Sequence, residues 1–287
     1  MRLATYLADG AENFGVVTDR GLIDLRQRLG ARGIRDLLAR GAFAEASRFA
    51  QETPDRALGS VTFLPVIPVP AHCYCVGVNY ADHLREVQAA GVARPLPKQP
   101  SLFIRYPETF VGQDEPLVMP KVSDDFDYEA ELAVIIGKGG RYIPREQALS
   151  HIAGYSCFND GSIRDWQFHS SQVTSGKNFV GTGGFGPWMV TPDEVGDVGR
   201  LAISLTVNGA VLQNGNTADM LFGVADIVAY ASAFLPLQAG DVIATGTPAG
   251  VGFARKPPIW LKAGDVCEVH IERIGTLRNT VVKASDD

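Results

Sequence analysis

The sequence of 287 residues lacks the features that mark several common classes of protein. Its four cysteines, at positions 73, 75, 157 and 267, are too few for a disulfide framework in a chain of this length. It has no run of lysine and arginine, and a net charge of −6 argues against a nucleic-acid partner. No apolar stretch approaches the ~20 residues that span a bilayer, so we expect no membrane segment.

The sequence also lacks two motifs of catalysis and nucleotide binding, and we expect no signal peptide. No Gly-x-Ser-x-Gly elbow supplies a serine nucleophile, and the loop at Gly246–Pro248 lacks the Gly-x-x-x-x-Gly-Lys-Ser/Thr spacing of a phosphate cradle. The first residues reach Asp9 before an apolar run could form a signal peptide. We therefore expect a cytoplasmic location, and we expect neither ester cleavage through serine nor a nucleotide on that loop.

The composition is typical of a folded protein, with 46% hydrophobic and 20% charged residues. Cys73 and Cys75 share one face of an apolar, strand-like run. A metal or redox role would need more sulfur or histidine nearby in the sequence. We therefore interpret both cysteines as small buried side chains.

Residues 1–65 are predicted to form a small N-terminal α/β domain. Strand-like runs at 3–7, 14–17 and 22–25 are separated by turn signals, and apolar spacing predicts helix over 34–49. Residues 64–70 hold three prolines, which resist both helix and central strand. This stretch is predicted to be an extended linker.

Residues 71–287 are predicted to form a second, β-rich domain. Strands are expected at 131–137, 201–207, 241–245 and 266–271, and helices at 81–90, 145–150 and 220–234. Asn208-Gly209, after the second of these strands, is a strong hairpin signal. The mix predicts an α+β fold with peripheral helices rather than an alternating βαβ fold.

Two carboxylates stand at the start of an apolar strand. Glu129 and Glu131 share one strand face, where residues i and i+2 lie ~7 Å apart and repel unless a positive charge lies between them. Magnesium and manganese prefer such oxygen ligands. The alternative is an exposed acidic strand edge. The apolar run at 132–136 argues against it, because that run leads directly into the core.

A third carboxylate, Asp160, ends the strand-like run at 155–158. Arg164 and Gln167 follow at a spacing that places them beside Asp160 on a helical turn, and Lys177 comes next along the chain. Asp160 could equally be a helix N-cap with Arg164 as its i+4 ion-pair partner. Taken together, these residues offer an anionic metal site with cations around it for a carboxylate substrate.

A possible catalytic base lies on the helix expected at 81–90. His83 and Glu86 are three residues apart and thus on one helix face. A carboxylate that fixes the imidazole could make it a base that activates water. The alternative is a salt bridge on the surface of the helix.

Six short motifs follow one another along the chain. They are Val76–His83, Asp127–Leu132, Asn159–Gln167, Ser175–Lys177, Thr217–Met220 and Gly240–Pro248. In this order they resemble the fumarylacetoacetate hydrolase family, over roughly residues 70–280. The resemblance implies a mixed β-sandwich roll after a small N-terminal domain, and usually a homodimer.

The resemblance also implies roles for particular residues. Those matching the family's ligands for Mg²⁺ or Mn²⁺ are Glu129, Glu131 and Asp160. Lys177 matches the family's catalytic lysine, which meets the substrate's carboxylate or enolate oxygen. Those matching its substrate contacts are Arg164, Gln167 and Thr247. His83 and Glu86 resemble a pair that members cleaving carbon–carbon bonds carry on a mobile lid, here residues 80–100. Larger eukaryotic members place a further Asp ligand near Asn79, which puts fumarylacetoacetate itself in doubt as the substrate.

The expected partner is therefore a small 2-keto acid. The reaction expected first is hydrolysis of a carbon–carbon bond in a 2,4-diketo acid, an acylpyruvate such as fumarylpyruvate, to give pyruvate and a carboxylic acid. Two other enzymes would share the same site: an oxaloacetate decarboxylase, and an isomerase of 2-hydroxyhepta-2,4-diene-1,7-dioate, a hydroxymuconate-type acid. A catalytically silent keto-acid-binding protein is the non-enzymatic alternative.

Overall fold

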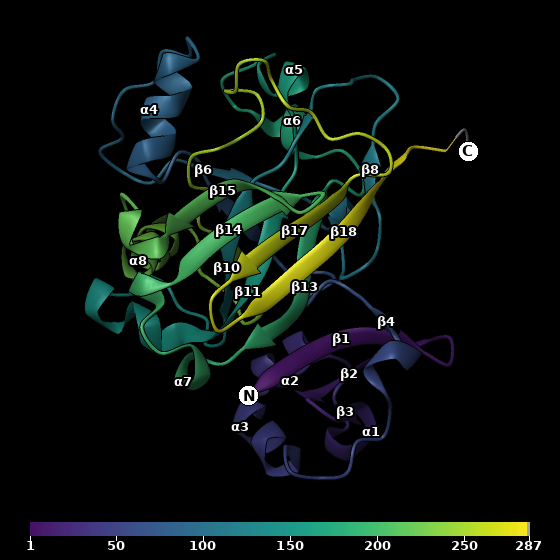
Figure 1. The fold of residues 1–287 in the computed structure, drawn as a ribbon. Coiled ribbons are helices and arrows are strands. Elements are labelled where there is room, and N and C mark those ends of the chain that lie inside the picture. Colours follow the sequence, from purple (N-terminus) through teal and green to yellow (C-terminus); the bar gives the residue numbers. More distant parts are fainter. Residues whose placement is uncertain (286–287) are drawn as a thin grey trace.

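One large sheet runs through the molecule from its N-terminal end to the far side (Figure 1). The structure is a computed structural model that describes residues 1–285. In spatial order, the strands of this sheet are β3 (Gly21–Asp24), β2 (Ala11–Thr18), β1 (Arg2–Ala8), β13 (Gly183–Val190), β11 (Ile152–Asp160), β10 (Ala130–Ile136), β16 (Val242–Ala244), β5 (Cys73–Val76) and β6 (Leu102–Ile104), with β4 (Thr62–Phe63) beside β1 and β7 (Phe110–Val111) beside β13.

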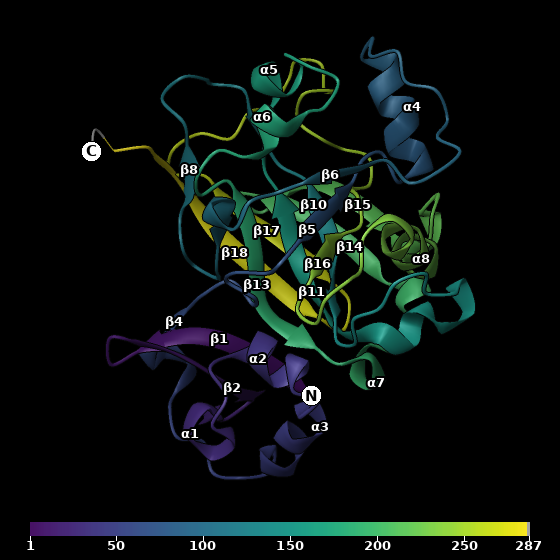
Figure 2. The same ribbon diagram turned by 180° about the vertical axis from the view of Figure 1, so that it is seen from behind.

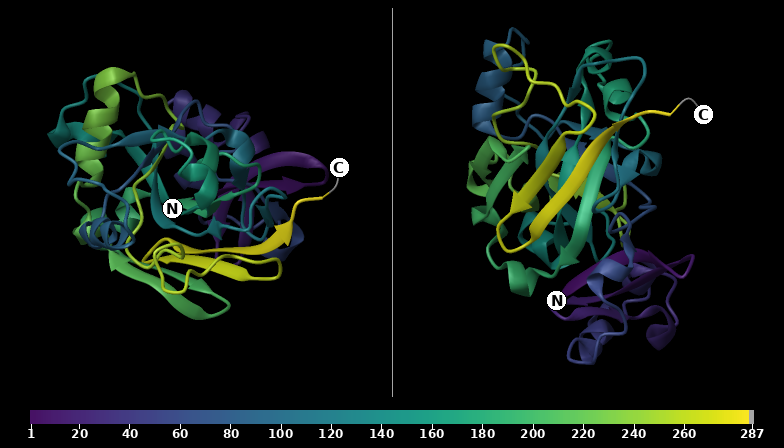
Figure 3. Two further views of the ribbon diagram at one scale, coloured as in Figure 1. Left: turned by 90° about the horizontal axis from the view of Figure 1, so that it is seen from above. Right: turned by 45° about the vertical axis from the view of Figure 1, so that its right-hand side comes forward.

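A second sheet packs on β10, β11 and β13. Its strands, in spatial order, are β15 (Ala210–Asn216), β14 (Ala202–Val207), β17 (Val266–Ile271), β18 (Gly275–Lys283) and β8 (Leu117–Met119). Seen from above, it forms a layer along one side of the molecule (Figure 3). A short pair, β9 (Phe126–Asp127) and β12 (Ser162–Ile163), lies apart from both sheets. The predicted β-rich sandwich is thus confirmed, as is the hairpin turn at Asn208-Gly209 between β14 and β15.

Strand β10 is buried on both faces, which accounts for its nearly unbroken apolar sequence. Leu132 and Val134 belong to the core between the two sheets. Ala133 and Ile135 point the other way, into a core that also holds side chains of the N-terminal segment. A polar side chain at the start of this strand is therefore held by packed neighbours on both sides.

The N-terminal segment lies at one end of the molecule (Figures 1 and 3). Its helices are α1 (Arg26–Leu29), α2 (Ile34–Ala39), α3 (Phe43–Ala46) and the 3₁₀ turns η1 (Ser47–Phe49) and η2 (Leu58–Ser60). The helix expected over 34–49 is interrupted where Gly41 takes a φ of 68°. Residues 64–70 form no regular element, as predicted. Strand β1 pairs with β13 of the following part, and the division at 65–71 stays a prediction.

The remaining helices surround the sheets. They are α4 (Ala81–Ala89), α5 (Arg164–Gln167), α6 (Thr174–Lys177), α7 (Pro192–Val195), α8 (Val224–Phe234) and the 3₁₀ turns η3 (Pro107–Thr109), η4 (Arg145–His151), η5 (Val198–Arg200) and η6 (Thr217–Asp219). Both ribbon views place α4, α5 and α6 at the end opposite the N-terminal segment (Figures 1 and 2). Helix α8 begins later than expected, because Leu221 and Phe222 bond to Asn79 through their backbone N–H groups.

All four cysteines are buried and unpaired, which agrees with their interpretation as small buried side chains. Burial raises the pKa of Cys157 to about 12, and it likewise raises that of Cys75, so both thiols stay protonated near neutral pH. Among residues 1–285, no helix combines the length and the apolar character that crossing a bilayer requires.

The junction between β11 and β12 gives a test of the packing. We predict that Gly161→Ala lowers the free energy of unfolding by about 1–3 kcal/mol, the usual cost of overpacking. A methyl group there would lie 2.1 Å from the Thr182 carbonyl oxygen, which is far inside van der Waals contact. Gly59→Ala is the control, because no atom of residues 1–285 lies within 4 Å of its added methyl. Equal urea midpoints for the two variants would contradict this account.

Candidate metal and substrate site

Sheet register gathers the predicted site at one end of β10. Ala130 at the start of β10 pairs with Asn159 near the end of β11, so Glu129 and Asp160 come together. Ala133 pairs with Ala244 near the end of β16, which brings the loop after that strand to the same edge. Strand β5 runs parallel to β16, so Gly77 after it lies there too. The residues come from distant parts of the sequence, and the sheet sets their spacing.

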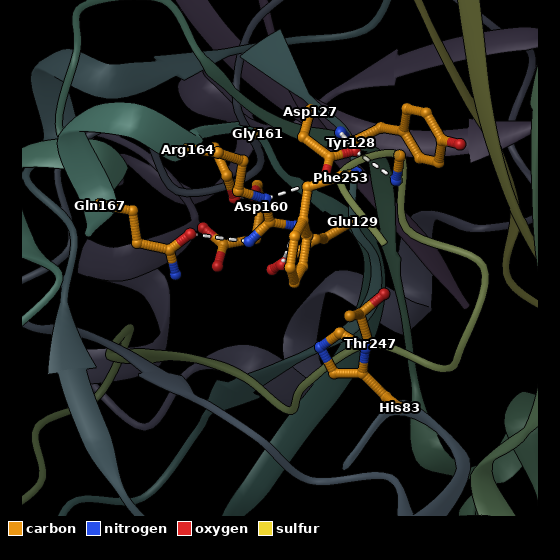
Figure 4. A network of polar contacts seen from close by, with 12 residues as sticks. His83, Asp127, Tyr128, Glu129, Asp160, Gly161, Arg164, Gln167, Thr247 and Phe253 are labelled. Carbon is orange, nitrogen blue, oxygen red and sulfur yellow. Dashed lines mark hydrogen bonds and ion pairs between the residues drawn. The ribbon is translucent and has the colours of Figure 1, made fainter. Parts of the chain in front are cut away.

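Glu129, Glu131 and Asp160 form a buried triad. Each offers a carboxylate oxygen that lies within 4.8 Å of the others. Their exposed fractions are 5%, 1% and 0%. The alternative of an exposed acidic strand edge is therefore wrong, and the predicted convergence of the three carboxylates is confirmed. Figure 4 shows two of the three, Glu129 and Asp160.

The two glutamates of the triad lie in opposite electrostatic surroundings. Burial alone would raise the pKa of Glu129, but Lys177 and Arg164 outweigh it and hold that pKa below its ordinary value. The Lys177 Nζ lies 2.6 Å from Glu129 Oε2, and the Arg164 Nη2 lies 2.7 Å from Oε1. Among residues 1–285, Glu131 accepts a hydrogen bond from the backbone N–H of Gly246 alone, at 2.9 Å. Burial, Asp160 and Glu129 raise its pKa well above the ordinary value.

Asp160 is held by two cations, one of which the sequence did not suggest. Lys177 Nζ lies 2.6 Å from its Oδ2, and Arg105 Nη1 lies 2.6 Å from its Oδ1. Arg164 pairs instead with Asp127 and Glu129, at 2.8 and 2.7 Å. Asp160 is thus neither the i+4 partner of Arg164 nor the N-cap of α5, which is Ile163.

Arg105 and Asp127 are functional neighbours that sequence reasoning missed. Arg105 is fully buried behind the triad and carries no motif of its own. Asp127 stands at the start of a motif already noted, next to Tyr128. Its carboxylate accepts the backbone N–H groups of Gly252 and Phe253, at 2.7 and 3.0 Å, and so ties that loop to Arg164. The motif was a signal for Asp127, and no signal marked Arg105.

The charges of this cluster do not cancel. The four buried carboxylates are Asp127, Glu129, Glu131 and Asp160, and the three buried cations are Arg105, Arg164 and Lys177. With all four acids ionised, one negative charge is left over, and Glu131 is the acid without a cationic partner within residues 1–285. Three hard oxygen donors beside an uncompensated charge fit a divalent cation such as Mg²⁺ or Mn²⁺. The residues present therefore suit the metal that the resemblance implies.

A cavity of about 300 Å³ opens beside the triad. The predicted site residues that line it are His83, Glu129, Glu131, Arg164, Gln167, Lys177 and Thr247. Asp160 and Glu86 are not among the lining residues. Asp160 contacts the lining residue Lys177, and Glu86 contacts the lining residue His83. The size of the cavity suits a small-molecule ligand.

Two polar side chains of the wall are oriented by bonds behind them. Thr247 Oγ1 accepts a hydrogen bond from Gln213 Nε2 at 2.7 Å, which leaves its hydroxyl proton to be donated elsewhere. Gln167 Oε1 accepts from Arg164 Nη1 at 2.7 Å, which leaves the amide N–H groups of Gln167 as donors. Both residues therefore offer donors to an anionic ligand (Figure 4).

Helix α4 carries the predicted base to the cavity. His83 Nδ1 lies 3.1 Å from Glu86 Oε2, and Glu86 Oε1 accepts the backbone N–H of Gly250 at 2.9 Å. His83 is 5% exposed, so the pair is not a salt bridge on the helix surface. With Nδ1 engaged by a carboxylate, Nε2 is the nitrogen available to a ligand.

Asn79 has no role in the triad. Its amide N–H₂ donates to the carbonyl oxygens of Thr245 and Phe222, at 2.7 and 3.0 Å, and its Oδ1 accepts the N–H of Phe222 at 2.9 Å. These bonds join three loops at the end of the sheet. The carboxylate set suggested from the sequence thus stands without a further ligand at this position.

The chain belongs to the fumarylacetoacetate hydrolase family. The family model described as fumarylacetoacetate (FAA) hydrolase C-terminal matches residues 72–282, so the resemblance seen in the motifs is confirmed. Oxaloacetate tautomerase FAHD2A, mitochondrial, from Homo sapiens is 42% identical over 235 residues, which are 81% of this chain and 73% of that protein.

Solved structures show the same fold over almost the whole chain. Fumarylacetoacetate hydrolase from Exiguobacterium antarcticum is 36% identical, with a TM-score of 0.82, and the match covers 99% of this chain and 100% of that chain. Maleylpyruvate hydrolase from Sphingobium sp. SYK-6, in complex with manganese(II) ion and pyruvate, is 30% identical, with a TM-score of 0.78 and the same coverage.

Glu131 gives the sharpest test of the metal site. We predict that Mg²⁺ or Mn²⁺ raises the melting temperature of the stripped protein, since a ligand at 100 times its Kd stabilises by about 2.7 kcal/mol. Glu131→Gln should lose most of this rise, yet should not destabilise the metal-free protein, because Gln is a neutral side chain of nearly the same shape as a carboxyl group that has no cationic partner.

Thermal melts with and without metal measure both effects. Glu146→Gln changes an exposed acid and serves as the control, with an undiminished metal response. An undiminished response in Glu131→Gln would contradict the assignment of this residue as a ligand.

Proposed function

We propose that the protein is a metal-dependent enzyme that hydrolyses a carbon–carbon bond in a small acylpyruvate. The observation that carries the proposal is a single cavity that joins the carboxylate triad to an imidazole held by a carboxylate. The triad, with a divalent cation bound, suits the 2-keto carboxylate of a substrate. The imidazole suits a water molecule that it can activate. The likeness to the solved structure of a maleylpyruvate hydrolase in complex with manganese(II) ion and pyruvate supports this choice.

The substrate's 2-keto carboxylate would lie against the triad end of the cavity. Glu129, Glu131 and Asp160 would hold Mg²⁺ or Mn²⁺, which acts as a Lewis acid that polarises a keto oxygen and stabilises the charge developing there. Lys177 supplies an ammonium group beside the triad. Gln167 and Thr247 donate hydrogen bonds to carboxylate oxygens and fix the orientation of the substrate.

His83 would move the protons of the reaction. Its Nε2 accepts a proton from water while the oxygen attacks the carbonyl carbon remote from the 2-keto carboxylate. The carbon–carbon bond then breaks, and its electron pair stays with the pyruvate fragment. The proton on His83 returns to that fragment, so the products are pyruvate and a carboxylic acid. Glu86 keeps the ring oriented and stabilises its charged form.

A second reaction, keto–enol interconversion of oxaloacetate, is favoured by the name of the human relative. It needs the same carboxylate cluster and a group that moves a proton on carbon, but no water. Oxaloacetate decarboxylation and isomerisation of a hydroxymuconate-type acid draw on the same cluster. A catalytically silent protein would keep the triad without turnover. The metal dependence and products of a substrate panel distinguish these outcomes.

We predict that the protein stripped with a chelator is inactive and regains activity with Mg²⁺ or Mn²⁺. The panel holds fumarylpyruvate, acetylpyruvate, oxaloacetate and a hydroxymuconate-type diacid, each followed by its own product. Simple esters should be untouched. The hydrolase assignment is supported if the acylpyruvates release pyruvate and have the highest kcat/KM of the panel. Faster enol conversion of oxaloacetate would move the assignment to a tautomerase, and full activity without metal would refute the metal role.

We predict that His83→Ala lowers acylpyruvate hydrolysis by about 10²–10⁴-fold, the usual contribution of a positioned base. Oxaloacetate decarboxylation should fall much less, because it needs no activated water. Initial rates on both substrates, at saturating metal, make the comparison. Asp82→Asn, an exposed change on the same helix, is the control. Equal losses on the two substrates, with metal binding unchanged, would contradict this role for His83.

A further inference from the structure

We propose that Arg94 selects substrates with a second anionic group, so that the preferred ligand is a 2-keto dicarboxylate rather than a monocarboxylate. The inference rests on the proposed function and concerns the same cavity. It adds a residue that lies outside the motifs noted in the sequence, and it assigns that residue a part in specificity.

Arg94 is held in place in the cavity wall. It follows α4, and its guanidinium Nη2 donates to the Gly77 carbonyl oxygen at 2.7 Å. Its own carbonyl oxygen accepts from Gln88 Nε2, also at 2.7 Å. Both residues that hold it belong to segments at the edge of the cavity, and Arg94 itself lines the cavity. The guanidinium is therefore positioned, rather than free to extend into solvent.

Arg94 differs from the other cations of the wall in having no acid to pair with. Three cations line the cavity, namely Arg94, Arg164 and Lys177. Arg164 and Lys177 are each paired with Glu129 at 2.6–2.7 Å. For Arg94, no carboxylate lies within ion-pair distance among residues 1–285.

The surroundings of Arg94 make that charge costly without an anion. Val87 and Val92 line the same cavity and present apolar side chains. Burial lowers the pKa of Arg94, an effect that Glu129 opposes from the triad end. A half-buried guanidinium with one neutral acceptor still has unused donors. Such a group is stabilised by a ligand carboxylate, which its planar fork can bind through two parallel hydrogen bonds.

The charges of the site agree with a dianion. The triad cluster carries one surplus negative charge, which a divalent cation would turn into one surplus positive charge. One substrate carboxylate would neutralise it. Arg94 adds a further positive charge, which a second substrate carboxylate would neutralise. A monocarboxylate would leave the guanidinium unpaired in the filled cavity, at a cost in affinity.

The test uses two unreactive probes that differ only in the distal group, 2-oxoglutarate and 2-oxopentanoate. Calorimetry on the Mg²⁺-loaded protein should show that 2-oxoglutarate binds about 10- to 100-fold more tightly. Arg94→Met should remove most of this ratio, and Arg94→Lys should keep part of it. Arg85→Met, an exposed arginine on α4 that pairs with Asp82, should leave the ratio unchanged.

The possible results separate this inference from the proposed function. A wild-type ratio near one, or a loss in Arg94→Met that is equal for both probes, would overturn it, because a bracing role for Arg94 weakens both alike. Turnover is measured in parallel on fumarylpyruvate and acetylpyruvate. Failure of both to react would refute the hydrolase, while an Arg94-dependent probe ratio would still establish the dicarboxylate site.

Discussion

The site depends on the buried carboxylate of Glu131, which has no cationic partner among residues 1–285. It is buried at the start of a strand packed on both faces, and within the described part of the chain one backbone N–H is its only donor. Every other acid of the cluster has a cation within 2.8 Å. Burial and the neighbouring acids raise the pKa of this carboxyl group, because an unpaired buried charge is among the most costly features a fold can carry. Its persistence at the wall of a cavity is therefore best explained by a ligand that supplies positive charge.

The cations around the triad have two tasks. Lys177 lies between Glu129 and Asp160, 2.6 Å from each, and so offsets the repulsion between their like charges. Arg105 and Arg164 approach the triad from behind and fix the orientation of Asp160 and Glu129. This arrangement holds the oxygen atoms in place before any ligand binds, which is the preorganisation that both metal binding and catalysis require.

The sequence was sufficient to predict features that depend on residues close together along the chain. The Glu-x-Glu spacing on an apolar strand, the i, i+3 pair His83–Glu86 and the Asn208-Gly209 turn each follow from the periodicity of one element, and the structure has all three. It was insufficient where the partner lies far along the chain. Arg105 pairs with Asp160, 55 residues away in the sequence. Asn79 bonds to Phe222, 143 residues away, and α8 begins after this contact. Arg164 turns to Asp127 and Glu129 rather than to Asp160, because β9 and β10 bring those acids closer.

The central claim is that Glu129, Glu131 and Asp160 share one divalent cation. Anomalous diffraction from crystals grown with Mn²⁺ tests it most directly, because it locates the ion without reference to activity. We expect one manganese peak per chain, within bonding distance of all three carboxylates, with the Lys177 ammonium displaced from between Glu129 and Asp160. The absence of a peak at the triad at saturating Mn²⁺, with Lys177 still paired to both acids, would contradict it.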